Sequence, residues 1–199
     1  MGFLRFFFDK MPIGVRYIFY INVIVFLLQM LVPFINYVLP LYPMSSNHFI
    51  ITQYITYQFA HGGILHIMCN MLALITILPF VEQRIGTKKF VFYYLLCGIA
   101  GALLHMSVVS DSATLVGASA AIWGMLVMFT FFRPNDPLYV FLIPIAIKSK
   151  YLIGTLFIVE LFCAIIGTSD NIGHLAHVGG GIAGAILFFA NKYIPIKRY

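Results

Sequence analysis

Six apolar segments, each about as long as a membrane-spanning helix, constrain this chain more than any other feature of its sequence. A helix needs roughly 20 mostly apolar residues to cross the hydrocarbon core of a bilayer. Such segments lie near residues 15–36, 62–81, 89–108, 115–132, 151–168 and 174–191. Of the 199 residues, 62% are hydrophobic and 9% are charged, whereas a soluble domain carries about 25% charged residues. The sequence therefore predicts an all-α polytopic membrane protein with six transmembrane helices.

The connecting segments suggest one domain over residues 1–199, with short tails at about 1–14 and 192–199. The apolar stretch Leu138–Ile147 is too short to cross a membrane, so we expect it at the interface. The first outer loop, roughly Asn36–Ala60, is long and rich in aromatic and aliphatic residues. A loop of this composition is expected to lie against the membrane surface or to dip into it.

The distribution of charge predicts the orientation of the bundle. All twelve Lys and Arg residues lie in the two tails or in the loops after the second and fourth spans, and the three opposite loops contain none. By the positive-inside rule, both termini and the basic loops should be cytoplasmic. The net charge of +6 forms no continuous basic face, so no nucleic-acid partner is expected. The three cysteines lie in apolar segments, which argues against a disulfide framework.

Polar side chains inside the spans are costly in lipid and therefore informative. His66 and Asn70 are one turn apart on the second span, Ser119 lies early in the fourth, and His177 lies early in the sixth. These three spans all start on the outer side in the predicted topology. At about 1.5 Å per residue, all four residues should lie within roughly 10 Å of the outer interface. Three separate helices are thus expected to bring a hydroxyl, an amide and imidazoles to one level.

These groups suit acyl transfer, because a serine becomes a good nucleophile when a neighbouring histidine takes its proton. The donors of an oxyanion hole would be the side chains of His66 and Asn70 and the backbone N–H of Ser119. No carboxylate has an obvious place beside His177, since Glu160 lies deeper in the fifth span and Asp170 lies in a loop. The expected arrangement is a Ser119–His177 dyad rather than a triad.

Small residues on the fourth and sixth spans favour the close approach that a Ser–His contact requires. His177, Gly180 and Gly184 share one face of the sixth span, while Gly117 and neighbouring small residues line the fourth. Trp123, one turn below Ser119, could pack against the imidazole of His177 and restrain it.

Three motifs together resemble the rhomboid family of intramembrane serine proteases. They are His61-Gly-Gly-Ile-Leu-His66-Ile-Met-Cys-Asn70, then Gly117-Ala-Ser119, then Ala176-His177-Val-Gly-Gly180-Gly-Ile-Ala-Gly184. Their order, spacing and span placement match the family over roughly Phe59–Leu187. Each motif is weak alone, because Gly-x-Ser or a single membrane histidine is more often structural.

The resemblance implies a six-helix rhomboid-like bundle with Ser119 as nucleophile, His177 as base, and His66, Asn70 and the Ser119 amide as oxyanion hole. Supporting roles are expected for His61, Gly117, Trp123, Gly180 and Gly184. The implied substrates are single-span membrane proteins in the lipid bilayer, cut near the outer ends of their spans. The implied location is the bacterial inner membrane. The family commonly has Gly after the serine, where this chain has Ala120, and we expect activity to survive the change.

Three other functions fit the sequence less well. A metal-dependent membrane protease is disfavoured because there is no His-Glu-x-x-His helix and the histidines lack a carboxylate partner. A catalytically inactive rhomboid-like factor that binds membrane proteins is disfavoured by the intact Ser119 and His177. A channel or transporter is disfavoured because no inverted repeat is evident. No metal and no cofactor is expected.

Overall fold

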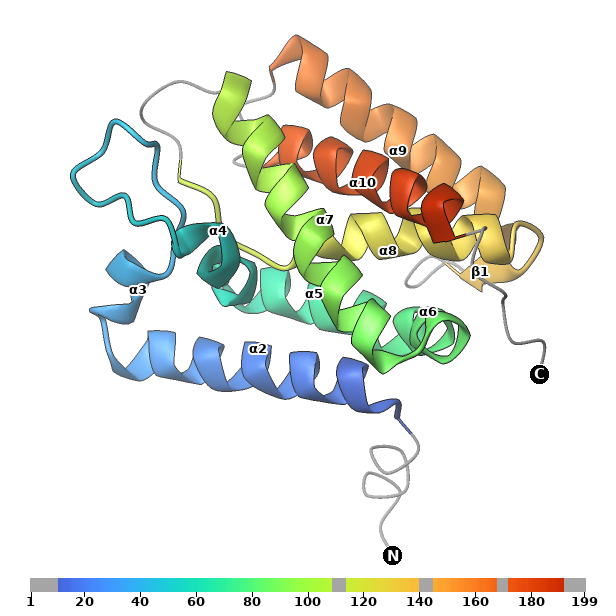
Figure 1. Ribbon diagram of the computed structural model, residues 1–199, viewed down its shortest axis with the longest axis horizontal. Helices are drawn as coiled ribbons and strands as arrows, with labels where there is room; N and C mark the ends of the chain where they lie inside the picture. Colours follow the sequence, from blue (N-terminus) through green and yellow to red (C-terminus); the bar gives the residue numbers. More distant parts are fainter. Residues whose placement is uncertain (1–10, 109–113, 140–144, 168–171, 192–199) are drawn as a thin grey trace, which may run out of the picture.

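The computed structural model describes residues 11–108, 114–139, 145–167 and 172–191, and these are mostly helical (Figure 1). The long helices are α2 (Ile13–Leu31), α7 (Thr87–Val108), α9 (Ser149–Ile166) and α10 (His174–Asn191). Shorter helices and two strands complete the fold: α3 (Ile35–Val38), α4 (Gln53–Thr56), η1 (Tyr57–Phe59), α5 (Ile64–Thr76), α6 (Leu78–Ile85), α8 (Ser119–Phe132), β1 (Pro137–Tyr139) and β2 (Ala146–Lys148).

Four of the described helices, namely α2, α7, α9 and α10, are long and apolar enough to cross a membrane. The segments Gln53–Phe59 and Ile64–Thr76 add a fifth candidate if they form one span bent by 93°. Helix α8 is apolar but only 14 residues long. The prediction of a helical membrane protein is confirmed, and the count of six spans stays a prediction.

Two of the predicted spans have a different internal structure from a single straight helix. The second, 62–81, is split: α5 ends at Thr76, and α6 begins at Leu78 with Pro79 in its first turn. Proline has no N–H and so cannot continue the hydrogen bonds of the preceding helix. In the fourth, 115–132, helix begins only at Ser119, because Leu115 forms an antiparallel bridge with Leu41 of the outer loop instead.

The segment expected at the interface, Leu138–Ile147, contributes to a short antiparallel pair of strands. Pro137 of β1 lies opposite Lys148 of β2, and Tyr139 lies opposite Ala146. Residues 140–144 fall outside the described part of the chain.

Large apolar side chains cover the outside of the bundle. Leu31 of α2 is 78% exposed and Ile165 of α9 is 75% exposed, and only 11% of the α9 span is buried inside the molecule. Water would penalise this surface, whereas lipid accommodates it. The chain is an integral membrane protein.

Helices α7, α8 and α10 pack against one another at the centre of the bundle, with α9 against α10 on one side and α2 against α5 on the other (Figure 1). Glu82 of α6 fastens α2 to this core: its carboxylate accepts hydrogen bonds from Gly14 N (2.8 Å), Val15 N (2.7 Å) and the Thr87 hydroxyl (2.7 Å). An acidic group at a helix N-terminus satisfies N–H groups that have no partner within the helix.

The start of α2 and the end of α10 lie at the same end of the bundle, opposite α3 and α4 (Figure 1). Lys89 Nζ donates to Asn191 Oδ1 (3.2 Å), and Arg84 lies 5.8 Å from the ring centre of Phe132. Arg133, which follows α8, lies 5.0 Å from the ring centre of Phe80 on α6. Basic residues of both predicted inner loops therefore lie at this end, as the positive-inside rule requires of them. The tails 1–10 and 192–199 and the acidic loop residues Asp111 and Asp170 lie outside the described residues.

The first outer loop is an ordered part of the structure, organised around Gln53. This side chain is 1% exposed; it accepts from Ile50 N (3.1 Å) and donates to His48 O (2.9 Å) and Val38 O (3.2 Å). Gln29 of α2 accepts from the backbone N of His61 (2.9 Å), which holds the loop end that leads into α5.

Candidate active site

Ser119 is the first residue of α8 and follows a non-helical segment that is held by backbone hydrogen bonds. Gly117 donates its N–H to the carbonyl of Tyr57 (2.9 Å), and its φ of +119° is one that residues with a side chain rarely adopt. A Cβ at this position would also come within 2.7 Å of the His66 ring. The first N–H groups of a helix have no intrahelical acceptor and carry a partial positive charge, so Ser119 sits where developing negative charge is favoured.

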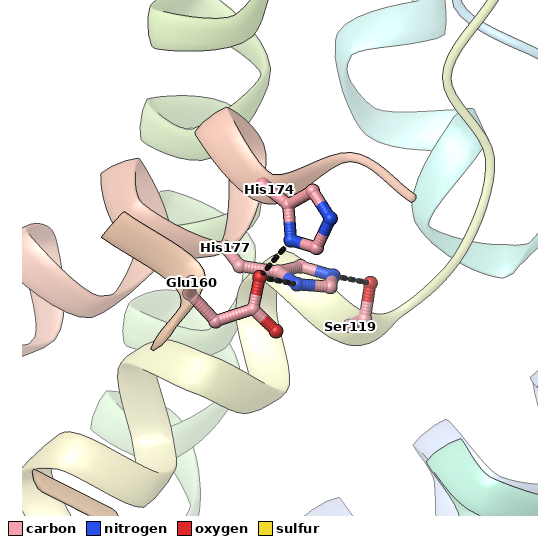
Figure 2. Close-up of polar contacts among 4 residues, drawn as sticks. All are labelled: Ser119, Glu160, His174 and His177. Atoms are coloured by element: carbon pink, nitrogen blue, oxygen red, sulfur yellow. Dashed lines mark hydrogen bonds and ion pairs between the residues drawn. The ribbon is translucent and has the colours of Figure 1, made fainter. Parts of the chain in front are cut away.

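His177 lies one turn into α10 and faces Ser119, with its Nε2 2.7 Å from Ser119 Oγ (Figure 2). Two glycines of α10 bring the helices this close. A Cβ on Gly180 would lie 2.0 Å from the carbonyl oxygen of Ala120, and one on Gly184 would lie 2.0 Å from that of Gly124. The α8–α10 approach is therefore set by backbone atoms on both sides.

His66 and Asn70 lie on α5, on the other side of the segment before Ser119. A Cβ on Gly117 would lie 2.7 Å from His66 Nε2 and 3.8 Å from Asn70 Nδ2, so both nitrogens approach the same point. The Asn70 amide nitrogen is buried and has no hydrogen-bond partner among the described residues. A buried donor without an acceptor costs stability. Such an unsatisfied donor is expected where the acceptor is a negative charge that is present only when substrate reacts.

The remaining supporting residues flank these groups. His61 is 3% exposed and its ring packs edge-on against His66, with 5.0 Å between ring centres. Trp123 lies with its ring centre 6.0 Å from that of His177, at the same distance as from Phe157 of α9. Trp123 thus lies beside the base His177, and His61 lies beside His66.

Ala120, in place of the glycine common in the family, fits because of α7. A Cβ on Gly101 of α7 would lie 2.8 Å from the Ala120 Cβ, so the absence of a side chain at 101 leaves room for the methyl group. Ala120 is 2% exposed. The substitution is accommodated by packing and leaves the Ser–His distance short.

The interpretation that no carboxylate lies beside His177 is wrong. Glu160 Oε2 lies 3.0 Å from His177 Nδ1 and 2.6 Å from His174 Nδ1 (Figure 2). The prediction compared the depths of Glu160 and His177 along their spans. Such a comparison takes no account of the length of a glutamate side chain or of the way the helices cross. A single acidic residue in an apolar span is by default a functional candidate, and that signal identifies Glu160 without a structure.

The histidines do have a carboxylate partner, so one of the two reasons for disfavouring a metal protease is wrong. Glu160, His174 and His177 place three potential ligand atoms within 4.8 Å of one another. However, the Glu160 oxygen is 2.6 and 3.0 Å from the two nitrogens. Two donors on one tetrahedral zinc lie about 3.3 Å apart, given bonds of about 2.0–2.1 Å. The cluster as it stands has the spacing of ion pairs and hydrogen bonds.

The site places the hydroxyl of Ser119 next to a base, His177. Two side-chain donors lie close to the segment that precedes Ser119. A serine activated by histidine, with N–H donors arranged for an oxyanion, is the combination that acyl transfer needs. Ser119 is half-buried and the side chain of His177 is 12% exposed, so the pair is sheltered but accessible.

Comparison with known proteins gives a consistent family assignment. The Rhomboid domain profile matches residues 48–193. RHOMBOID-like protein 1 of Arabidopsis thaliana is 31% identical over 140 residues, which are 70% of this chain and 34% of the plant protein. Rhomboid-like protease 3 of Toxoplasma gondii is 31% identical over 162 residues, 77% of this chain and 57% of that protein. Inactive RHOMBOID-like protein 8 of A. thaliana is 28% identical over 141 residues, 70% and 38% of the two chains.

The chain spans about a third to just over half the length of these curated relatives. The profile nevertheless covers the outer loop from residue 48, the helices that carry His66, Asn70, Ser119 and His177, and the end of α10. On this evidence, the chain belongs to the rhomboid family.

Proposed function

We propose that the protein is an intramembrane serine endopeptidase that cuts transmembrane segments of other membrane proteins with Ser119 and His177. The observation that carries the proposal is the 2.7 Å contact between Ser119 Oγ and His177 Nε2, made by two helices in backbone contact. A relative named as a protease supports it.

In the proposed reaction, His177 Nε2 takes the Ser119 hydroxyl proton as Oγ attacks the carbonyl carbon of the substrate. The C–N bond then breaks as His177 returns this proton to the leaving amine, and water releases the acyl group from Ser119 by the same steps in reverse order. The pair alone therefore supplies both general base and general acid.

The oxyanion of the tetrahedral intermediate is proposed to receive hydrogen bonds from His66, Asn70 and the Ser119 N–H. His66 Nδ1 lies 3.5 Å from the backbone N–H of Gly62, which is suited to an unprotonated Nδ1. In a neutral ring the proton is then on Nε2, the atom close to Gly117. His66 would thus present a donor in the required direction.

Substrate choice follows from the depth of the pair. Ser119 and His177 lie in the first turns of α8 and α10, the ends predicted to face outwards. We propose single-span membrane proteins as substrates, cut near the outer ends of their spans. We propose a bacterial inner membrane as its location, on the basis of the resemblance to short rhomboid proteases. The distribution of Lys and Arg supports the proposal that both termini are cytoplasmic.

The test compares wild type with Ser119→Ala and His177→Ala on a transmembrane model substrate in liposomes. Both variants should fold and both should lose cleavage, because members of a catalytic unit fail together. A fluorophosphonate probe should label wild type and not Ser119→Ala. Cleavage by Ser119→Ala at near the wild-type rate contradicts the proposal, and a wild type that binds the substrate without cutting it supports the inactive binding factor instead.

A further inference from the structure

The strongest observation outside the proposed reaction is a half-buried carboxylate behind the Ser–His pair. Glu160 lies on α9, the most lipid-exposed of the long helices. Its neighbours Val159 and Leu161 are 50% and 43% exposed, whereas the Glu160 side chain is only 16% exposed. An acidic group in a span is expensive in lipid and is normally turned towards a partner inside the bundle.

The partners of Glu160 are the Nδ1 atoms of two histidines, at the side of the site opposite Ser119. Figure 2 shows the imidazole of His177 between Ser119 Oγ on one edge and Glu160 Oε2 on the other. The second histidine, His174, lies 2.6 Å from the same oxygen through its own Nδ1. A single carboxylate oxygen thus connects the base to a second imidazole.

We propose that Glu160 is a positioning residue for the reaction, and that it holds His177 in the tautomer that can act as a base. This inference depends on the proposed function of Ser119 and His177. A carboxylate accepts but does not donate, so it favours a proton on His177 Nδ1. The neutral ring then has its lone pair on Nε2, where Ser119 donates at 2.7 Å. The carboxylate also stabilises the imidazolium that forms when His177 takes the serine proton.

The geometry assigns a supporting role to His174. Glu160 Oε2 forms its shorter contact with His174, whereas the N–H direction of His177 Nδ1 is not aligned with Oε2 at 3.0 Å. Catalytic hydrogen bonds are often poorly aligned in a substrate-free enzyme and tighten when substrate binds. His174 therefore restrains the carboxylate close to His177 while leaving it free to align during the reaction.

Glu160→Gln is the informative substitution because it keeps the shape of the side chain but replaces an acceptor-only carboxylate with an amide that also donates. The amide can donate to Nδ1, which favours a proton on Nε2 and blocks the transfer from Ser119. In soluble proteases with a Ser-His-Asp triad, the same exchange lowers kcat by roughly 10⁴. The contact here is less well aligned, so we expect a fall in kcat of about 10²–10³, with KM within about threefold of wild type and slower fluorophosphonate labelling of Ser119.

The chain provides a matched control, because it contains only one other glutamate. Glu82 is 2% exposed and holds the start of α2. Glu82→Gln makes the same chemical change in a structural role, so it should lower the melting temperature in detergent and leave kcat of the folded enzyme within about twofold of wild type. An equal loss of kcat in both variants overturns the proposal.

A measurement on wild type tests the proposal even if Glu160→Gln fails to fold. In protein with ¹⁵N-labelled histidine, the His177 signals, assigned by their absence in His177→Ala, should show a protonated Nδ1 and an unprotonated Nε2. A protonated Nε2 in the resting enzyme overturns the proposal.

Two further outcomes separate this inference from others. If Ser119→Ala is inactive while Glu160→Gln keeps near wild-type kcat, the inference is wrong and the proposed function stands. If wild type binds zinc stoichiometrically, loses activity to chelators and loses zinc binding in Glu160→Gln, then the three atoms form a metal site and the positioning role is overturned.

Discussion

At the scale of single residues, Asn70 offers a clear test of the oxyanion hole. Its amide nitrogen is buried, has no acceptor within the described part of the chain, and approaches the same glycine as His66 Nε2. Loss of one oxyanion donor typically costs about 10²–10³ in kcat. We expect Asn70→Ala to cost about 10¹–10², because His66 and a backbone N–H share the charge. The measurement is a kcat and KM comparison on a transmembrane substrate.

Asn22 on α2 gives the control for that prediction. It is also a fully buried asparagine in a span, but its amide donates to the carbonyl of Ile18 (2.7 Å) within its own helix. Asn22→Ala should leave kcat nearly unchanged. A rise in KM with constant kcat for Asn70→Ala would move Asn70 from oxyanion binding to substrate binding.

The residues that sequence alone could place are those with a short-range pattern. His66 and Asn70 are one turn apart, and Ser119 and His177 lie early in their spans, so counting residues predicts a common depth. Glu160 lies six residues before the end of α9, or about 9 Å along its axis, whereas His177 is about 4.5 Å into α10. Counting residues therefore predicts different depths for Glu160 and His177. Only the packing of α9 on α10 shows that their side chains meet.

At the scale of helices, the α8–α10 contact should determine both stability and activity. Gly180→Ala would place a methyl group 2.0 Å from a backbone oxygen that no side-chain rotation can move. Extra atoms in a well-packed core cost about 1–3 kcal/mol when neighbours adjust. Here α8 and α10 must move apart, so we expect Gly180→Ala to have a lower melting temperature in detergent. Because the same movement separates Ser119 from His177, we also expect a large loss of fluorophosphonate labelling in the protein that remains folded.

Gly154 on α9 is the matched control, because a Cβ there would meet nothing within 4 Å. Gly154→Ala removes a helix glycine without a clash and should preserve or raise stability. Equal melting temperatures for Gly180→Ala and Gly154→Ala would show that α8 and α10 are less tightly opposed than the structure indicates.

Element boundaries show which information the sequence lacks. The hydropathy pattern predicted α7 and α10 to within two residues of their ends, because continuous apolar runs with charged flanks need only local information. It did not predict that residues 115–118 lie outside the helix. They are as apolar as a helix, but Leu115 pairs with Leu41, 74 residues earlier in the chain. Such a long-range backbone contact has no local signature.

At the scale of the whole molecule, the topology predicts where a substrate is cut. A peptide bond within a helix is shielded by its own hydrogen bonds, so the outer end of a substrate span must unwind before Ser119 can attack it. Gly and Pro lower this cost, by about 1 and about 3 kcal/mol relative to Ala in a helix interior. We expect cuts near the outer boundary, enhanced by Gly or Pro and suppressed when these become Leu.

Mass spectrometry of products from a substrate in which Gly-Pro is moved stepwise along its span measures this preference. The Leu-substituted span is the control for helix stability. Cuts at the cytoplasmic end, or cuts that ignore helix breakers, would show that the orientation or the site is wrong.

The atoms that face each glycine also determine which substitutions the protein can accept during evolution. At Gly98, an added methyl group would meet the side chain of Gln58 at 2.1 Å, so a smaller residue at 58 could compensate for it. At Gly180 and Gly184 the opposing atoms are carbonyl oxygens, which every amino acid carries. No second mutation on α8 can relieve those clashes. The α8–α10 contact that holds Ser119 and His177 therefore has no such compensatory route, whereas the contact between Gly98 of α7 and Gln58 can change through matched pairs of substitutions.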